Sequence, residues 1–244
     1  MAKSTRVADR AERAAAALRE QQRRERRRTL LTVGGVVLAM ILIIGGGFLL
    51  NQARDSSKNI AESAAGAGSG DYGVTIGKSS APNTVVIYED FLCPYCGELE
   101  RASHAKLATL ADEGKVLVEY RPFNLLNTDY SVASAAAFKV VLDKSGPEVA
   151  KKFHDLLYAD QPSERGPFPD AEWLVQKAVE AGATESDVRD GIVNGAGDDW
   201  VTSATKAAQQ AGVRSTPTIL LNGTLFQNGR TIDDLAANLL DALK

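Results

Sequence analysis

Residues 84–96 read TVVIYEDFLCPYC and join a run of β-branched residues to a pair of cysteines three positions apart. Its first five residues are rich in β-branched side chains and predict a short buried strand. Apolar positions then recur at helical spacing from Cys93 to about Asp112, which predicts a helix that begins at the first cysteine. Residues 116–121 (VLVEYR) predict a second strand after a short loop. A strand, a helix and a strand of these lengths form a βαβ unit.

The end of the chain predicts a β-hairpin followed by a helix. Residues 218–221 and 224–226 are short strands, and Asn222-Gly223 between them is a strong two-residue hairpin turn. The final helix has Thr231 and Asp234 placed to form a capping box at its start.

A helical insertion is expected between these two units, over about residues 128–199. Apolar residues repeat there at helical spacing in several successive stretches. Asp170 is expected to cap one of these helices. Thr184, with Asp187 three residues later, resembles a second capping box.

Cys93-Pro94-Tyr95-Cys96 is the one strong chemical motif of the sequence. The unpaired N–H groups and the dipole of a helix N-terminus favour a thiolate at Cys93 and lower its pKa. Pro94 suits the first helical position, where its missing N–H costs nothing. Cys93 is expected to be exposed at the helix tip, and Cys96, one turn further in on the side of Leu99, to be shielded. Thiol–disulfide exchange needs an outer nucleophile and an inner resolving thiol of this kind, with Pro94 and Tyr95 forming the loop between them.

Two other uses of the cysteine pair are less favoured. A structural disulfide between cysteines three residues apart closes too small a loop to stabilise the chain much. Coordination of zinc or copper would require further cysteine or histidine ligands. His104 would lie roughly 16 Å from Cys93 along the same helix, and nothing in the sequence brings His154 near the cysteines. Both histidines are expected to be ordinary, partly exposed residues, and no metal site is predicted.

An apolar segment upstream predicts a membrane anchor. Residues 30–50 read LLTVGGVVLAMILIIGGGFLL and carry no charge. A helix of this length spans about 31 Å, which matches the core of a bilayer. Residues 1–29 carry ten Lys and Arg against four acids, which predicts a basic cytoplasmic tail that contacts anionic lipid headgroups rather than nucleic acid. A cleaved signal peptide is the alternative, but its apolar region would usually be shorter.

The rest of the chain is expected to lie outside the cytoplasm. Residues 51–71 are rich in Gly, Ala and Ser and predict a flexible linker to a domain at residues 72–244. The whole chain has a net charge of −3. Because residues 1–29 are basic, the rest of the chain carries a larger net negative charge than this total. With 44% apolar residues the chain is not wholly disordered, and two cysteines exclude a disulfide-dense scaffold.

Residues 72–244 resemble the DsbA-like disulfide oxidoreductases. The resemblance rests on residues 90–96 (DFLCPYC) after a strand and on residues 213–218 (VRSTPT) before the last hairpin. It implies the α/β thioredoxin fold with an inserted helical subdomain. It also implies that Pro217 is cis and faces the cysteines, and that Thr216 offers backbone hydrogen bonds to an extended substrate.

One position departs from the pattern of this family. Many relatives carry a buried acid six residues before the first cysteine, which helps move a proton to or from the inner thiol; here that residue is Ile87. Glu89 shares a face with Ile87 only if the strand stays regular. Glu89, or water, is therefore the candidate for proton transfer at Cys96, whereas the ordinary interpretation of Glu89 and Asp90 is a strand end or turn.

The resemblance and the predicted anchor together imply a membrane-tethered enzyme that introduces disulfides into exported proteins, because disulfides persist outside the cytoplasm. Its implied partners are exported proteins with free thiols and a quinone-linked membrane oxidase of the DsbB or vitamin K epoxide reductase type, with no bound cofactor. Nothing in the sequence looks like a dimerisation module, so a monomer is expected. Two alternatives remain: an extracytoplasmic reductase or isomerase with the same fold, and a tethered protein that binds metal through the two thiols.

Overall fold

The computed structural model describes residues 71–244. The predicted basic tail (1–29) and membrane helix (30–50) lie outside the described residues, as does the linker (51–71) except for Asp71. Among residues 71–244, no helix is both long enough and apolar enough to cross a membrane. The anchor therefore stays a prediction.

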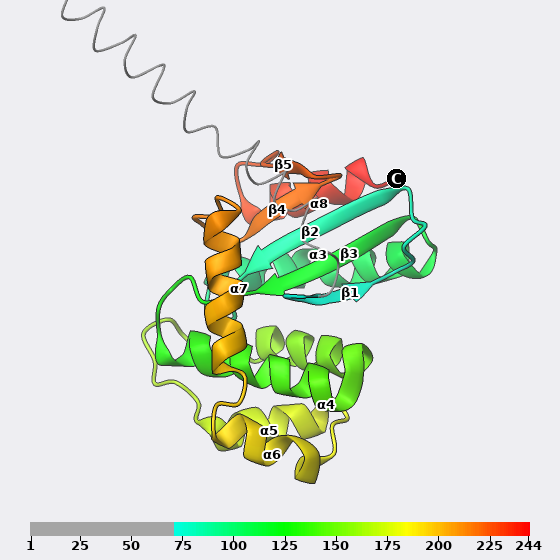
Figure 1. Cartoon of the computed structure of the whole chain (residues 1–244). Coiled ribbons are helices and arrows are strands. Elements are labelled where there is room, and N and C mark those ends of the chain that lie inside the picture. The colour runs from blue at the N-terminus through cyan, green and yellow to red at the C-terminus, as the bar shows by residue number, and fades with distance from the viewer. Residues whose placement is uncertain (1–70) are drawn as a thin grey trace, which may run out of the picture. The chain divides into compact units, whose positions relative to one another are not determined.

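A five-stranded mixed sheet lies at the centre of the described domain (Figure 1). Its strands are β1 (Val74–Ile76), β2 (Asn83–Glu89), β3 (Val116–Pro122), β4 (Thr218–Leu221) and β5 (Thr224–Phe226). Their order in the sheet is β1-β3-β2-β4-β5, with β2 and β3 parallel and the other three pairs antiparallel. Strand β1 was not expected from the sequence, because three residues are too few to show an alternating pattern.

Helices flank this sheet on both faces. Helix α3 (Pro94–Asp112) connects β2 to β3, which confirms the predicted βαβ unit. Helix α8 (Ile232–Ala242) packs against α3, and both lie behind the sheet in Figure 1. Helix α7 (Asp198–Gln210) runs in front of it. The order of elements is that of the thioredoxin-like α/β fold predicted above.

The helical insertion lies between β3 and β4. Helices α4 (Asp129–Ala159), α5 (Ala171–Glu180) and α6 (Glu185–Val193) pack together as a layer beside the sheet (Figure 1). Helix α4 is interrupted at Gly146, whose φ of 83° is a left-handed conformation that glycine adopts without strain. The residue that follows, Pro147, begins the second helical segment of α4.

The predicted hairpin turn and two of the three predicted helix caps are present in the structure. Asn222 and Gly223 have φ of 51° and 75°, as the tight turn between two strands requires. The Asp170 carboxylate accepts a hydrogen bond from the N–H of Trp173 and caps α5. Thr231 and Asp234 form the predicted capping box of α8.

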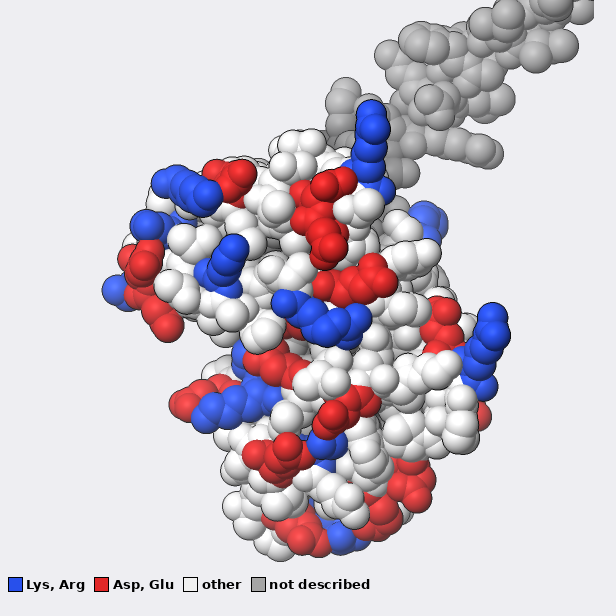
Figure 2. Space-filling model, turned by 180° about the vertical axis from the view of Figure 1, so that it is seen from behind, with Lys and Arg blue, Asp and Glu red and all other residues white. Residues whose placement is uncertain are grey.

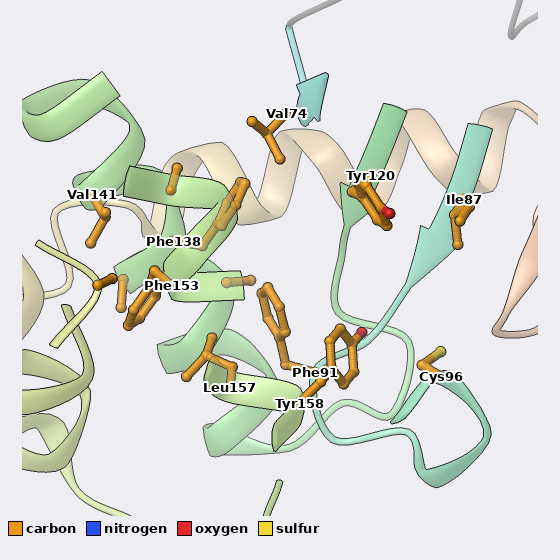
Figure 3. Packing of buried hydrophobic residues seen from close by; sticks show 14 of the residues in the cluster. Val74, Ile87, Phe91, Cys96, Tyr120, Phe138, Val141, Phe153, Leu157 and Tyr158 are labelled. Carbon is orange, nitrogen blue, oxygen red and sulfur yellow. The ribbon is translucent and has the colours of Figure 1, made fainter. Parts of the chain in front are cut away.

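An aromatic cluster joins the insertion to the active-site turn. The Phe91 ring lies 6.0 Å from that of Phe138 and 5.3 Å from that of Tyr158, measured between centroids. Figure 3 shows Phe91 and Tyr158 side by side, between the turn that carries Cys96 and the helical segment that carries Leu157. Burying side chains of this size contributes several kcal/mol, roughly 3–5 kcal/mol for each large aromatic by the cost of truncation. The insertion therefore supports the turn directly.

Charged side chains are interspersed on the face of the domain shown in Figure 2. Among the described residues, Arg189 forms exposed ion pairs with Glu172 and Glu185. Exposed pairs of this kind contribute about 0–1 kcal/mol each. The stability of the domain therefore rests mainly on its buried core.

The predicted capping box at Thr184 is wrong, and the error provides a control. Thr184 is the N-cap of α6, but its side chain makes no capping hydrogen bond, and only its backbone oxygen accepts from the N–H of Asp187. We expect Thr231→Ala to lower the free energy of unfolding by about 1 kcal/mol, because a real cap is lost. Thr184→Ala should cost much less. Urea unfolding followed by circular dichroism measures both, and equal losses would contradict the assignment.

Candidate active site

Helix α3 begins at the first cysteine. Cys93 is its N-cap, with extended backbone angles (φ −67°, ψ 117°), and Pro94 occupies the start of the first turn. The Cys93 carbonyl accepts hydrogen bonds from the N–H groups of Cys96 (3.1 Å) and Gly97 (3.2 Å). The Cys93 Sγ atom therefore lies at the helix N-terminus, where unpaired N–H groups and the helix dipole favour a negative charge.

A buried carboxylate holds the turn that leads into this helix. Asp90 accepts hydrogen bonds on Oδ1 from the N–H of Leu92 (2.9 Å) and the hydroxyl of Ser131 (2.8 Å). On Oδ2 it accepts from the N–H groups of Leu125 (2.8 Å) and Leu126 (3.0 Å). The turn is thus fastened both to the loop after β3 and to the first turn of α4.

Gln161 also positions the turn, a role that its surroundings in the sequence do not indicate. Its Nε2 donates to the carbonyls of Phe91 (3.0 Å) and Cys93 (2.9 Å). A single glutamine in a polar loop carries no signal of such a contact, which exists only because the end of α4 lies beside the turn.

The Cys93 thiol differs from the expectation in one respect. We expected it to be exposed at the helix tip, but it is only 4% exposed. The Thr216–Pro217 loop covers it, and the Cys93 Sγ lies 3.5 Å from the Thr216 carbonyl oxygen, to which only the protonated thiol can donate. The chain is in its dithiol state, with both cysteines free.

The two thiols are held at very different acidities. A hydrogen bond from Cys96 lowers the pKa of Cys93 from an ordinary 9.0 to about 6, with help from Thr216 and against the effect of burial. Burial raises the pKa of Cys96 well above its usual value, and the negative charges of Cys93 and Glu89 raise it further. At neutral pH, Cys93 is therefore a thiolate and Cys96 a thiol.

A groove runs beside the Cys93 end of α3. The peptide bond between Thr216 and Pro217 is cis, as the resemblance implied. Both residues line a groove with a volume of about 670 Å³, together with Tyr95, Ile219, Phe226 and Ile232. Tyr95 is 59% exposed at the edge of this groove.

Glu89 lies at the end of β2, and the strand stays regular that far. β2 pairs with β3 from Asn83 to Glu89, so Glu89 lies on the same face as Ile87. Ile87 occupies the family's acid position as a buried core residue. The Glu89 carboxylate is buried, and its Oε1 lies 2.6 Å from Nε2 of His154.

His154 corrects a second expectation. We expected an ordinary, partly exposed residue away from the cysteines, but His154 is fully buried and contacts Glu89. Its ring also lies 5.1 Å from that of Tyr158 and 4.7 Å from that of Tyr120, between centroids. His154 and Glu89 are 65 residues apart, so this pair exists only in the folded domain. His104 is exposed, as expected.

The other nitrogen of His154 contacts two further carboxyl groups. Nδ1 lies 2.9 Å from Oδ1 of Asp155 and 3.6 Å from Oε1 of Glu100. Burial opposes protonation of His154. The negative charge of Glu89 and the hydrogen bonds with Asp155 and Glu89 nevertheless raise the pKa of His154 to about 9. The hydrogen bond and charge of His154 lower the pKa of Asp155 to about 2, against its burial. In the dithiol state His154 is therefore an imidazolium held between carboxylates.

Three of these groups have the spacing of metal ligands. The ligand atoms of Glu100, His154 and Asp155 all lie within 4.8 Å of one another. The Lys151 ammonium already contacts both carboxylates, at 3.3 Å from Glu100 and closer to Asp155. Since Lys151 supplies the positive charge that a cation would bring, the geometry favours an ion-pair network over a metal site.

Comparisons with known proteins agree with this geometry. A family model described as "Thioredoxin" matches residues 69–241. The reduced form of the disulfide bond oxidoreductase DsbG from Mycobacterium tuberculosis is 32% identical, with a TM-score of 0.63, covering 75% of this chain and 90% of that one. Oxidised DsbA from Mycobacterium tuberculosis is 31% identical, with a TM-score of 0.57, covering 68% and 98%. BdbD from Bacillus subtilis, at 20% identity and a TM-score of 0.61, shares the fold.

Curated relatives carry a similar segment within longer proteins. The serine/threonine-protein kinase PknE of Mycobacterium tuberculosis is 29% identical over 99 residues, covering 38% of this chain and 18% of the kinase. The Na(+)/H(+) antiporter NhaA 3 of Salinispora tropica is 29% identical over 167 residues, covering 68% and 24%. This chain therefore spans a quarter or less of the relatives' length.

The fold and the buried dithiol define a thiol–disulfide oxidoreductase. The chain belongs to the thioredoxin family and is a protein disulfide oxidoreductase of the DsbA-like type.

The asymmetry between the two thiols can be tested with a matched pair of substitutions. Cys96→Ala removes the group that donates to the Cys93 thiolate, so the pKa of Cys93 should rise from about 6 toward its ordinary value. Cys96→Ser keeps a donor at the same place, and the pKa should stay low. The pH dependence of iodoacetamide alkylation measures Cys93 alone in both variants. The same midpoint in the two variants would show that the hydrogen bond is not the cause.

Proposed function

We propose that this protein is a membrane-tethered, extracytoplasmic oxidase that introduces disulfides into exported proteins through Cys93 and Cys96. The observation that carries the proposal is the placement of Cys93 at the N-terminus of α3 beside the Cys96 thiol, which together lower the pKa of Cys93 to about 6. A group that stabilises the thiolate stabilises the dithiol form relative to the disulfide, and so makes the disulfide a stronger oxidant. Each 1.4 kcal/mol of such stabilisation changes the potential by about 30 mV.

Oxidation proceeds in two exchanges. A substrate thiolate attacks Cys93 in the Cys93–Cys96 disulfide, which forms a mixed disulfide and releases Cys96 as a thiolate that takes up a proton. A second thiolate of the same substrate then attacks the substrate sulfur that is bonded to Cys93 in the mixed disulfide. The substrate gains a disulfide, and Cys93 leaves as a thiolate. The two electrons of the substrate dithiol end on the cysteine pair.

The acidities of the two thiols suit these steps. Cys93, with the lower pKa, is the better leaving group in the second exchange. Cys96, whose pKa is raised by burial, holds its proton after release. We infer that Glu89 exchanges that proton with Cys96, because its negative charge acts on the Cys96 thiol and it lies on the strand that precedes the turn.

We infer that the groove beside Thr216 and Pro217 binds the substrate. An extended peptide can pair with the backbone of Thr216 as a short added strand. Apolar side chains such as Phe226 and Ile232 line the groove, and Tyr95 stands exposed at its edge. This surface would take an unfolded segment beside a cysteine with little dependence on its sequence.

The compartment and the partners belong to the same proposal. The uncharged residues 30–50 anchor the chain in the cell membrane, with residues 1–29 in the cytoplasm and residues 72–244 outside. Turnover requires an oxidant for the dithiol, and a quinone-linked membrane oxidase of the DsbB or vitamin K epoxide reductase type would serve without a bound cofactor. The protein acts as a monomer in the bilayer and has no nucleic-acid partner.

The reduction potential separates this proposal from a reductase or isomerase. We expect equilibration of the full chain with glutathione buffers, followed by alkylation of free thiols, to give a value near −120 mV, at the oxidising end of the thioredoxin class. Cys93→Ser should show no transition and serves as the control. A value near about −270 mV would replace the oxidase with a reductase.

The membrane topology is tested separately. Protease added to intact spheroplasts should remove residues 72–244 and leave a membrane-bound fragment that contains residues 1–50. A cytoplasmic marker protein should stay intact in the same sample. Protection of the domain, or its release into the medium as a soluble protein, would contradict the tethered arrangement.

A further inference from the structure

A chain of hydrogen-bonding groups connects the region of the inner thiol to the surface. It begins at Glu89 Oε1, which lies 2.6 Å from His154 Nε2, and continues from His154 Nδ1 to Asp155 Oδ1 over 2.9 Å. Glu89 and His154 are buried, whereas the Asp155 side chain is 37% exposed. The exchange of disulfides described above does not by itself use the last two of these groups.

The outer end of this chain opens on a different face from the substrate groove. Asp155 lines a cavity with a volume of about 440 Å³ between α3 and α4, together with Glu100, His104 and Tyr158. The groove beside Thr216 shares no lining residue with this cavity. The domain therefore has one opening beside Cys93 and another at the end of the Glu89–His154–Asp155 chain.

The inner thiol needs a way to exchange its proton. Cys96 is only 2% exposed, so solvent does not reach it directly. It must lose a proton before it can attack a mixed disulfide at Cys93, and must gain one when it leaves the disulfide. The Cys96 thiol interacts with the backbone of Asp90, the neighbour of Glu89, and with the charge of Glu89 itself.

We propose that His154 is a positioning residue that couples Glu89 to Asp155, so that the Cys96 proton is exchanged with water in the α3–α4 cavity and not through the substrate groove. The proposal rests on thiol exchange at Cys93 and Cys96, and it holds whichever way the electrons flow.

The protons balance over one cycle. In the dithiol state Glu89 is a carboxylate and His154 carries a proton on each nitrogen. When Cys96 attacks a mixed disulfide, its proton passes to Glu89, and the Nδ1 proton of His154 is released beside Asp155, which orients it, to water in the α3–α4 cavity. The pair changes from carboxylate and imidazolium to carboxylic acid and neutral imidazole, so its net charge stays zero. Reduction of the disulfide reverses each transfer, and Nε2 keeps its proton throughout.

The groups around the imidazole favour this route. Lys151, on the same helix, holds Asp155 and Glu100 in place beside Nδ1. The hydroxyls of Tyr120 and Tyr158, whose rings flank the imidazole, have no hydrogen-bond partner among the described residues. Burial raises the pKa of both tyrosines well above the usual value, so neither competes for the proton.

The first test is the ionisation of His154 in the two redox states. The full chain, labelled with ¹⁵N-histidine, is examined by NMR at pH 7 in reduced dithiothreitol and in excess oxidised glutathione. We expect both nitrogens of His154 to be protonated in the dithiol state and only Nε2 in the disulfide state. His104 is the one other histidine in the sequence, and His104→Gln assigns the signals. The same ionisation of His154 in both states would overturn the proposal.

The second test uses a substitution near the surface, because replacing buried His154 could prevent folding. Asp155→Asn breaks the outer end of the chain. Asp143→Asn is the matched control, since each aspartate pairs with a lysine four residues before it on α4. The measured step is the attack of Cys96 on a mixed disulfide between Cys93 and glutathione, followed by stopped flow.

We expect Asp155→Asn to slow this step at least about tenfold at pH 7, below the 10²–10⁴ that a direct acid or base contributes. The decrease in rate caused by Asp155→Asn should become smaller as the pH rises, because hydroxide then competes as the acceptor of the proton. Glu89→Gln should slow the step further, and Asp143→Asn should not change it. Equal rates for Asp155→Asn and Asp143→Asn would overturn the route through Asp155. A potential near that of a reductase would reject the oxidase but would leave this step measurable.

Discussion

The hydrogen bonds of the Asp90 carboxylate are the interaction on which the rest of the site depends. One buried carboxylate accepts from two groups near the turn and α4, and from two N–H groups of the loop after β3. A buried charge without partners would be costly, so the four donors must be brought together for the domain to fold. This requirement ties the turn before Cys93 to the sheet and to the helical insertion at once, and it sets the direction in which α3 begins.

The difference between the two cysteines follows from where α3 begins. Cys93 is at the helix N-terminus, where the Cys96 thiol and the helix N–H groups stabilise its thiolate. Cys96 is one turn further in, where burial raises its pKa and nothing comparable stabilises a charge. Cys93 thereby becomes the better leaving group, and Cys96 becomes the thiol that keeps its proton at neutral pH. The same local geometry carries the oxidase proposal and the need for a proton route.

The helical insertion does more than enlarge the domain. Its α4 supplies Ser131 to the Asp90 carboxylate, the rings that pack on Phe91, and His154 to Glu89. The family's acid position holds Ile87 in this chain, and the carboxylate appears two residues later on the same strand face. His154 from the insertion then lies 2.6 Å from it and supplies the partner that a buried acid requires.

Local patterns in the sequence determined the βαβ unit, the hairpin at Asn222-Gly223, the capping box at Thr231 and the place of the cysteines at a helix start. Each of these depends on residues close together in the chain, where spacing and side-chain type are sufficient. The exposure of Cys93, the position of Gln161 and the environment of His154 depended on contacts across 65 residues or more. These features follow from the packing of the helices on the sheet, because a lone polar residue has no periodicity in the sequence that would indicate its partner.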